Sequence, residues 1–329
     1  MKVCVLYGGM STEHDVSVKS AESVISNLDK NKYDIYPVYI DINGNYYDNN
    51  KEKINNIIDY LKNMDVVFPV LHGRYGEDGT IQGLLELIKV PYVGCKVLAS
   101  SVCMDKVYTK KLLDSSNIRV TKYLFIKKDN SKYICFDKLF NEEVLDKDEL
   151  INKVSEYLSY PVFVKASRSG SSIGVYECNK DNIINNIENA FKYDDKVLIE
   201  EKIVGRELEV AVLGNNKIEI SNIGEINNNS NFYSYESKYI DSVNTSICKD
   251  LDSNIINEIK NVAYKAYRVC DLSGLSRIDF FLDKDNNVIL NEINTLPGFT
   301  SISMYPKLMM DLGYSYSSLL DKLIESAYK

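Results

Sequence analysis

The stretch that decides the fold is residues 276–294, which read SRIDFFLDKDNNVILNEIN. Two runs of strand character, Ile278 to Leu282 and Val288 to Ile293, flank the turn-forming residues 284–287, and this pattern predicts a β-hairpin. With a four-residue loop, three pairs face each other across the strands: Asp283 with Val288, Asp279 with Glu292, and Arg277 with Asn294. Side chains alternate along a strand, so Arg277, Asp279, Glu292 and Asn294 share one face. The other face is apolar and suits a core: Ile278, Phe280, Leu282, Ile289 and Ile293.

The polar face of this hairpin predicts a metal site. Two carboxylates directly across a strand pair repel each other unless a cation lies between them. Mg²⁺ prefers one or two carboxylates, an amide or water oxygen, and the phosphates of a nucleotide. Asp279, Glu292 and Asn294 fit that description, and Arg277 beside them would face an anion. The alternative is a surface hairpin whose acidic side chains are only solvated.

The residues after the hairpin favour the functional interpretation. Residues 295–303, TLPGFTSIS, pass through a Pro297-Gly298 turn into small hydroxyl side chains that suit backbone N–H groups presented to an anion. Here the sequence resembles the ATP-grasp enzymes and, among them, the D-alanine:D-alanine ligase family. The motifs RID, NEINTLPGFT and SMYP carry this resemblance in their order and spacing, and it extends from Val3 to about Leu320.

Composition sets the broad class of the protein. A chain of 329 residues with 45% hydrophobic residues can bury two or three cores of domain size. A net charge of −8 and the lack of a basic run argue against nucleic-acid binding. No apolar run reaches the roughly 18 residues of a membrane span, and the seven scattered cysteines read as reduced thiols. We expect a cytoplasmic protein without a membrane partner.

The N-terminal part predicts a doubly wound α/β unit. An apolar strand at residues 2–7 ends at Gly8-Gly9, a helical pattern follows, and further strands are expected at residues 33–41 and 65–71. Ligands of such sheets bind at the carboxyl ends of the strands, where Glu13 (GGMSTEHDVS) and His72 (LHGRYGEDG) lie. By its position alone, a glutamate at the start of a helix is more often a cap or a helix-dipole partner than a ligand. The ligase resemblance implies that Glu13 holds the ammonium of the first D-alanine, with His72 and Glu77 supporting the pocket.

Two elements are expected to hold the phosphates of a nucleotide. A helix is predicted over residues 99–113, and the resemblance places its Lys106, in the motif MDK, on the phosphates. Residues 160–176, YPVFVKASRSGSSIGVY, read as a strand that ends at Lys165, a Ser- and Gly-rich loop, and a second strand. Such a loop lets backbone and hydroxyl donors, among them Ser171 and Ser172, approach a phosphate. It is not a Walker A motif, and as a bare pattern it could be an ordinary polar hairpin.

The resemblance implies the remaining nucleotide and substrate contacts. An expected strand at residues 197–213, bent at Gly205, supplies the contacts to adenine and ribose: Glu200, Glu201, the Ile203 backbone and Glu207. Asn291 is a further nucleotide contact. Residues 226–247 show no convincing hydrophobic periodicity of a helix or a strand, and a segment of this length is typical of a functional loop. In this loop Lys238 and Tyr239, within the motif YxYxxKY, would meet phosphates and substrates, and Tyr239 would join Glu13 and Ser171 in a hydrogen-bonded set.

These inferences combine into one hypothesis. The fold is α/β: an ATP-grasp fold with an N-terminal doubly wound parallel-sheet (pre-ATP-grasp, Rossmann-like) domain, divided into residues 1–96, 97–199 and 200–329. The resemblance implies that ATP phosphorylates one D-alanine and that the amine of a second attacks the acyl phosphate, for peptidoglycan precursor synthesis. Two Mg²⁺ ions, for which Mn²⁺ can substitute, and the lysines at 106, 165 and 238 neutralise the triphosphate. Arg277 and the Gly298 N–H stabilise the oxyanion, and Ser303 and the Met304 backbone hold the second carboxylate.

Other functions stay open at this level. A D-alanine:D-serine ligase shares nearly every motif, although such enzymes commonly carry Phe at the position of Tyr239. Another carboxylate–amine ligase of the ATP-grasp group would leave Glu13 and the LHG motif unexplained. A non-catalytic nucleotide-binding module should have lost metal ligands, yet Asp279, Glu292 and Asn294 are all present. A homodimer is compatible with every one of these functions.

Overall fold

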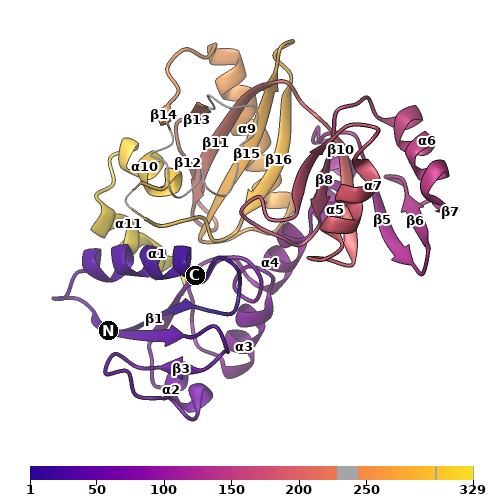
Figure 1. The fold of residues 1–329 in the computed structure, drawn as a ribbon. Helices are drawn as coiled ribbons and strands as arrows, with labels where there is room; N and C mark the ends of the chain where they lie inside the picture. Colours follow the sequence, from indigo (N-terminus) through magenta and orange to yellow (C-terminus); the bar gives the residue numbers. More distant parts are fainter. Residues whose placement is uncertain (228–243, 301, 329) are drawn as a thin grey trace.

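Three β-sheets follow one another along the chain in the computed structural model, which describes residues 1–227, 244–300 and 302–328 (Figure 1). Within this described part they occupy residues 2–70, 123–201 and 205–294. Lys238 and Tyr239 lie outside the described residues. Among the described residues, no helix combines the length and the apolar character needed to cross a membrane.

The N-terminal sheet has the strand order β3-β2-β1-β4. Its elements are β1 (Lys2–Gly8), α1 (His14–Asn27), β2 (Asp34–Ile40), β3 (Tyr46–Tyr47), α2 (Ile57–Lys62), β4 (Val66–Val70) and α3 (Thr80–Ile88). β1 runs parallel to both β2 and β4, so the chain winds to both sides of the first strand. Alternate residues of β1 enter cores on opposite faces, Val3 and Val5 on one and Cys4 and Leu6 on the other. This two-sided burial explains the continuous apolar run in the sequence.

A pair of short helices leads from this sheet to the central one: α4 (Val97–Met104) and α5 (Lys106–Ser115). The single helix expected over residues 99–113 was therefore wrong. Asp105 leaves the helical conformation with ψ 101°, and its carboxylate accepts hydrogen bonds from the backbone N–H groups of Val107 and Tyr108. An aspartate N-cap of this kind begins a new helix, and it makes Lys106 the first residue of α5.

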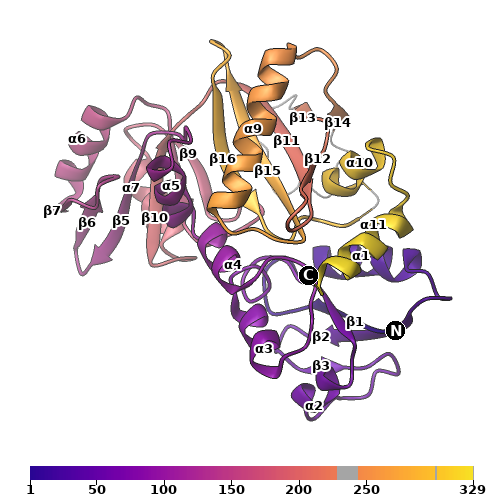
Figure 2. The ribbon, with the colours of Figure 1, turned by 180° about the vertical axis from the view of Figure 1, so that it is seen from behind.

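The central sheet is antiparallel, in the order β7-β6-β5-β10-β8-β9. Its elements are β5 (Tyr123–Asp129), β6 (Lys132–Phe136), β7 (Glu142–Leu145), α6 (Lys147–Tyr157), β8 (Val162–Ala166), β9 (Val175–Cys178), α7 (Ile183–Ala190) and β10 (Lys196–Glu201). Figure 2 shows this part projecting to one side of the other two sheets. Residues 123–145 form the antiparallel meander β5-β6-β7.

The C-terminal sheet has the order β14-β13-β11-β15-β16, with β12 beside β11. Its elements are β11 (Gly205–Leu213), β12 (Glu219–Ile220), β13 (Gly224–Asn227), β14 (Asn244–Ile247), α9 (Ser253–Val269), β15 (Leu275–Asp283) and β16 (Val288–Asn294), followed by α10 (Met304–Asp311) and α11 (Tyr316–Ser326). The bend at Gly205 carries the chain from one sheet to the next, and a Cβ there would collide with the carbonyl of Leu282. Side chains of α10 and α11 share one core with those of β1 and β4.

The predicted hairpin is formed by β15 and β16, and its polar end has the expected register. Asp279 faces Glu292 and Arg277 faces Asn294. The turn end was predicted wrongly, because Leu282 and not Asp283 faces Val288. The Asp283 N–H donates a hydrogen bond to the Asn287 carbonyl, so the loop has three residues, with Asn286 at φ 60°. A β-bulge lies between the turn end and the polar end of the hairpin, where Asn291 is an extra residue that faces no residue of β15. This extra residue offsets the shorter loop, so the register at the polar end is the predicted one.

The bulge also corrects the predicted apolar face. Val288 and Leu290 join Ile278 and Phe280 in the core under α9, whereas Ile289 is buried outside that core. One extra residue reverses the alternation of side chains along a strand. In β16, the side chains between the turn and Asn291 therefore lie on the face opposite to the predicted one. The polar end is unaffected, since it lies beyond the bulge.

Candidate active site

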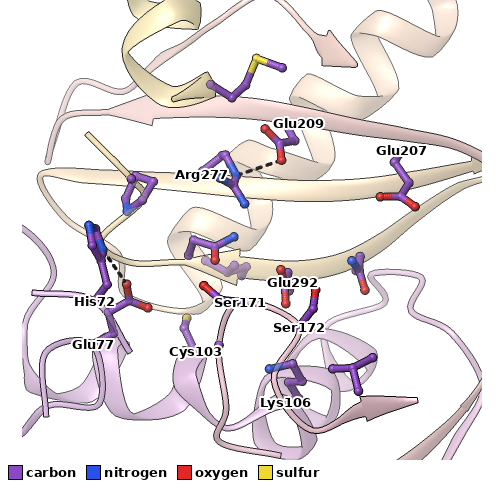
Figure 3. Close-up of a pocket in the computed structure, with 18 of the residues that line it drawn as sticks. His72, Glu77, Cys103, Lys106, Ser171, Ser172, Glu207, Glu209, Arg277 and Glu292 are labelled. Carbon is purple, nitrogen blue, oxygen red and sulfur yellow. Dashed lines mark hydrogen bonds and ion pairs between the residues drawn. The ribbon is translucent and has the colours of Figure 1, made fainter. Parts of the chain in front are cut away.

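A cavity of about 300 Å³ is lined by residues from all three parts of the chain. Eighteen residues predicted for the site line it: Glu13, His72, Glu77, Lys106, Lys165, Ser171, Ser172, Glu200, Glu201, Ile203, Glu207, Arg277, Asn291, Glu292, Asn294, Gly298, Ser303 and Met304. Asp279 is buried immediately behind this lining, where it pairs with Arg277. Figure 3 shows His72 and Glu77 at one end of the cavity and Glu207 at the other, with Arg277 and Glu292 between them.

One wall of the cavity rests on a buried carboxylate shared by two lysines. Glu200 of β10 forms an ion pair with Lys165 of β8 and another, of 2.9 Å, with Lys110 of α5. Thr121 connects them, since its hydroxyl donates to Glu200 at 2.8 Å and accepts from Lys110 at 2.7 Å. We call these four residues the Glu200 cluster.

The pKa values of the Glu200 cluster are shifted by burial and by the neighbouring charges. Burial works against the Glu200 carboxylate, but the charges of Lys110 and Lys165 outweigh it and hold the pKa of Glu200 far below its usual range. For Lys165 burial is again outweighed, here by Glu200, and the pKa is raised. Burial dominates at Lys110 and lowers its pKa. Both oxygens of Glu200 are therefore committed to lysines, and Lys165 is held at the edge of the cavity.

Sequence reasoning missed Lys110. The residue is 2% exposed, and with Val107 and Leu113 it forms the buried face of α5. That spacing of three residues is the available signal, because a lysine on the apolar stripe of a helix needs a buried anion. The partner, Glu200, lies 90 positions further along the chain, so the pattern alone did not identify it.

The serine- and glycine-rich loop between β8 and β9 is anchored where it leaves β8. Ser167 donates to Asp105 at 2.9 Å, and Asp105 also accepts from Lys196 at 2.5 Å. The next residue, Arg168, is held by Asp194 through its backbone N–H at 2.6 Å and through its guanidinium. The loop therefore leaves the sheet from a fixed base.

The tip of this loop reaches the N-terminal part of the chain. Ser171 and Ser172 have positive φ angles of 49° and 61°, a conformation that non-glycine residues seldom adopt outside functional sites. Ser171 donates a hydrogen bond to the buried carboxylate of Glu13. A Cβ on Gly170 would lie 2.6 Å from a carboxylate oxygen of Glu13, so any larger residue there would displace this carboxylate. Two of the three residues expected to form one hydrogen-bonded set are thus in contact.

Near Glu13, His72 and Glu77 form a buried pair. Nδ1 of His72 lies 3.5 Å from Glu77 and 3.1 Å from the Leu296 carbonyl, and Nε2 lies 3.1 Å from the Ser20 hydroxyl (Figure 3). We call Glu13, His72 and Glu77 the His72 cluster. Burial, with the Glu13 charge, raises the pKa of Glu77 to about 6 although His72 opposes the shift. Burial disfavours the imidazolium of His72, but Glu77 and Glu13 outweigh it and raise the pKa.

The polar face of the hairpin carries a preformed cation. Arg277 donates to both oxygens of Asp279 at 2.8 and 2.7 Å and lies 3.3 Å from Glu209. Asn294 donates to Asp279 at 3.0 Å. Burial lowers the pKa of Arg277, but Asp279, Glu209 and Glu292 outweigh it and raise the pKa. This set of carboxylate and amide oxygens has the chemistry that a divalent cation prefers.

The Pro297-Gly298 turn and the start of α10 form the cavity wall beside the His72 cluster, since the Leu296 carbonyl before this turn lies 3.1 Å from His72. Ser303 is the N-cap of α10, and its hydroxyl accepts from the Thr300 N–H at 3.1 Å. A Cβ on Gly298 would lie 2.9 Å from that hydroxyl. The start of α10 is therefore packed directly against the turn, as the small residues of this segment predict.

Comparisons with known proteins give a consistent result. The family described as "D-ala D-ala ligase C-terminus" matches residues 112–325, and "D-ala D-ala ligase N-terminus" matches residues 2–61 and 50–95. The chain is 44% identical to the D-alanine--D-alanine ligase of Clostridium acetobutylicum, over 99% of this chain and 97% of the relative.

Solved structures agree with this result. The VanG D-Ala:D-Ser ligase of Enterococcus faecalis superposes with a TM-score of 0.85 at 34% identity over 99% of each chain. The D-alanine--D-alanine ligase of Bacillus anthracis complexed with ATP gives a TM-score of 0.79 at 30% identity, over 100% of this chain and 97% of that one. The similarity thus extends over the whole chain and includes all three sheets.

Proposed function

Because the chain belongs to the D-alanine--D-alanine ligase family, we propose that it uses ATP to join two D-alanines into D-alanyl-D-alanine for peptidoglycan synthesis in the cytoplasm. One observation carries this proposal beyond the family assignment. A single cavity combines a lysine-rich wall, a carboxylate–arginine face and a buried glutamate that contacts the serine loop. We also propose that residues 1–96, 97–199 and 200–329 act as its three domains.

The Glu200 cluster and the neighbouring loop would bind ATP. Lys165 and Lys106 supply positive charge for the phosphates, and Ser171 and Ser172 with the loop backbone supply donors. Lys106 already reaches the loop, since its ammonium donates to the Ser169 carbonyl at 2.6 Å. Since the Glu200 carboxylate is bound to lysines, we assign the adenine to residues 201–203 and the ribose to Glu207, with Asn291 nearby.

The hairpin face would hold the divalent metal. Asp279, Glu292 and Asn294 are the proposed ligands of two Mg²⁺ ions, which Mn²⁺ could replace. When bound, the metal neutralises charge on the phosphates of ATP. Arg277 would stabilise the oxyanion that forms when the second amine attacks, together with the Gly298 N–H. Its guanidinium is positioned for this role by Asp279 and Glu209.

The two amino acids would bind side by side, so that the amine of the second can reach the activated carboxylate of the first. Glu13, supported by His72 and Glu77, would hold the ammonium of the first D-alanine, whose carboxylate is phosphorylated. Ser303 and the Met304 backbone would hold the carboxylate of the second. Lys238 and Tyr239 remain predicted contributors to phosphate and substrate binding.

D-alanine is favoured over D-serine as the second substrate. The structural relative VanG is a D-Ala:D-Ser ligase at 34% identity, whereas curated relatives at 43–44% identity are D-alanine--D-alanine ligases. Tyr239, where D-serine enzymes commonly have Phe, points the same way.

The substrate assignment is tested by phosphate release from Mg-ATP with a panel of D- and L-amino acids. We expect turnover with D-alanine alone, little with L-alanine, and a dipeptide product identified by mass spectrometry. D-serine should be incorporated much less well than D-alanine when both are present. Turnover that required an L-amino acid, or ATP hydrolysis without a dipeptide, would overturn the assignment.

A homodimer is a further part of this proposal. Leu87 on α3 and Leu98 on α4 are 82% and 62% exposed, and Val97 beside Leu98 is also exposed. Exposed apolar side chains gathered on neighbouring helices suit a protein–protein contact. Sedimentation equilibrium measures the oligomeric state directly.

A further inference from the structure

Lys307 on α10 is a lysine in the cavity wall that the mechanism above does not use. It follows Ser303 by one helical turn, and Ser303, Met304 and Lys307 all line the cavity. Residues four apart on a helix share a face, so Lys307 lies on the same side of α10 as the proposed carboxylate site. Its ammonium donates a hydrogen bond to the hydroxyl of Thr245 on β14 at 3.1 Å.

The partner of the Lys307 ammonium differs from the partners of three other cations in the cavity wall. Lys165 pairs with Glu200, Lys202 with Glu177, and Arg277 with Asp279. Within residues 1–227, 244–300 and 302–328, no carboxylate lies within 4 Å of the Lys307 ammonium, and its hydrogen-bond partner is a neutral hydroxyl. An anionic ligand can replace the hydroxyl at this ammonium, because a carboxylate adds a Coulomb attraction that a neutral hydroxyl does not provide.

The surroundings limit what that anion can be. The lysines assigned to phosphate, Lys106 and Lys165, come from α5 and β8, whereas Lys307 belongs to α10 beside Ser303 and the Gly298 turn. β13 approaches α10 closely, since a Cβ on Gly224 would lie 2.7 Å from the Met304 sulfur. A small carboxylate suits this end of the cavity better than a nucleotide phosphate.

We propose that Lys307 binds the α-carboxylate of the second D-alanine and makes the site favour an acceptor that carries this carboxylate. The inference rests on the proposed function and adds to it a specificity-determining residue. The carboxylate replaces or joins the Thr245 hydroxyl as the partner of the ammonium. Lys307 takes no part in transfer of the phosphoryl group or in attack by the amine.

The test compares two acceptors in the wild type and in Lys307→Gln. D-alaninamide lacks the carboxylate, so it cannot be phosphorylated and serves only as an acceptor. With D-alanine as the donor, Lys307→Gln should raise the acceptor KM for D-alanine about 10- to 150-fold, the range for loss of a hydrogen bond to a charged group. The KM for ATP should stay within about twofold. Formation of D-alanyl-D-alaninamide, measured by mass spectrometry, should change little.

Two further variants separate a charge effect from a structural one. Lys307→Arg keeps the positive charge and should restore most of the acceptor affinity. Lys322→Gln removes an exposed lysine of α11 outside the cavity and should behave as the wild type. The melting temperature of each variant shows whether it folds.

Several outcomes would overturn the inference. These are an unchanged acceptor KM in Lys307→Gln, an equal loss with D-alanine and D-alaninamide, or a failure of Lys307→Arg to restore binding. If the wild type forms no dipeptide, the proposed function fails, and the inference fails with it. If the wild type forms dipeptide and Lys307→Gln is indistinguishable from it, only the role of Lys307 is lost.

Discussion

The Glu200 cluster and the His72 cluster are both buried, yet they balance charge in opposite ways. In the Glu200 cluster two lysines share one carboxylate, and the pKa of Glu200 is held far below its usual range against the effect of burial. In the His72 cluster two carboxylates face one imidazole, and burial with the second carboxylate raises the pKa of Glu77 to about 6. One cluster keeps a fixed positive charge, and the other titrates near neutral pH.

This difference matches the ligands proposed for the two ends of the cavity. A triphosphate needs cations whose charge does not depend on pH, and the excess of lysine over glutamate provides them. An ammonium substrate needs an excess of negative charge, and Glu13 with Glu77 provides it. Binding of an ammonium beside Glu13 should favour the ionised form of Glu77, because an opposite charge nearby lowers the pKa of a carboxyl group. The charge balance of each cluster thus predicts the sign of its ligand.

The largest effect is expected from Glu200→Gln, which keeps the shape of the side chain but leaves Lys110 and Lys165 without their anion. Removing one member of a buried ion pair destabilises a protein by about 3–5 kcal/mol. Urea denaturation at pH 7 should show a loss of that order. Glu201→Gln is the matched control, since Glu201 is only partly buried and accepts a hydrogen bond from the Lys122 N–H at 2.7 Å. Equal stability of the two variants would contradict the assigned role of the cluster.

Acid should reproduce the effect of this mutation in the wild type. The folded-state pKa of Glu200 lies below the unfolded value of 4.5, so its contribution is complete above about pH 4.5 and is lost as pH falls further. Between pH 5 and pH 3, Glu200→Gln should therefore lose less unfolding free energy than the wild type. Parallel pH profiles would show that Glu200 is not the carboxylate responsible.

The second prediction concerns the hairpin face and separates stability from function. In the absence of metal, Arg277 already neutralises Asp279, so Glu292→Gln should leave the melting temperature level or raise it slightly. The same change should remove the stabilisation given by Mg-ATP, which is about 2.7 kcal/mol at a hundredfold excess over Kd, and most ligase activity. Thermal melts with and without Mg-ATP measure both effects.

Asp283→Asn is the control for this prediction, because Asp283 lies at the turn end of the neighbouring strand β15. Asp283 accepts hydrogen bonds from the N–H groups of Asp285 and Asn287, so it stabilises the turn. Its replacement should lower stability slightly, because the turn loses these hydrogen bonds, and should leave the response to Mg-ATP intact. Full Mg-dependent activity in Glu292→Gln, or its loss in Asp283→Asn, would exclude the metal site proposed here.

The hairpin shows how far local pattern can predict structure. Alternation correctly predicted two strands and the facing of Asp279 with Glu292, but it misplaced the turn by one residue and missed the bulge at Asn291. A four-residue loop without a bulge and a three-residue loop with one bulge give the same register at the polar end. The sequence could not distinguish them because apolar residues run continuously from Val288 to Leu290.

Partners distant in the sequence account for what was missed elsewhere. The motifs predicted the cavity lining, because each places chemistry at the end of a strand or in a loop. They did not predict that Glu200 would bind Lys110, or that Asp105 would divide one helix into two. Both features depend on tertiary contacts: Lys110 becomes buried only when α5 packs near β10, and Asp105 is also held by Ser167 and Lys196.

The smallest effect is expected from Glu77→Gln and appears as a change of slope with pH. The pKa of Glu77 is raised from 4.5 to about 6 and that of His72 is raised above 6.5, so the folded protein binds more protons than the unfolded chain across this range. Stability contributed by the pair is present at low pH and is lost as pH rises through these values. Glu77→Gln removes one group and the main partner that raises the other, so unfolding free energy should fall less steeply between pH 5 and pH 8. The difference should be on the order of 1–2 kcal/mol.

Asp78→Asn, at the neighbouring position, is the control and should keep the wild-type slope of unfolding free energy against pH. An unchanged slope in Glu77→Gln would show that the pair does not titrate as described.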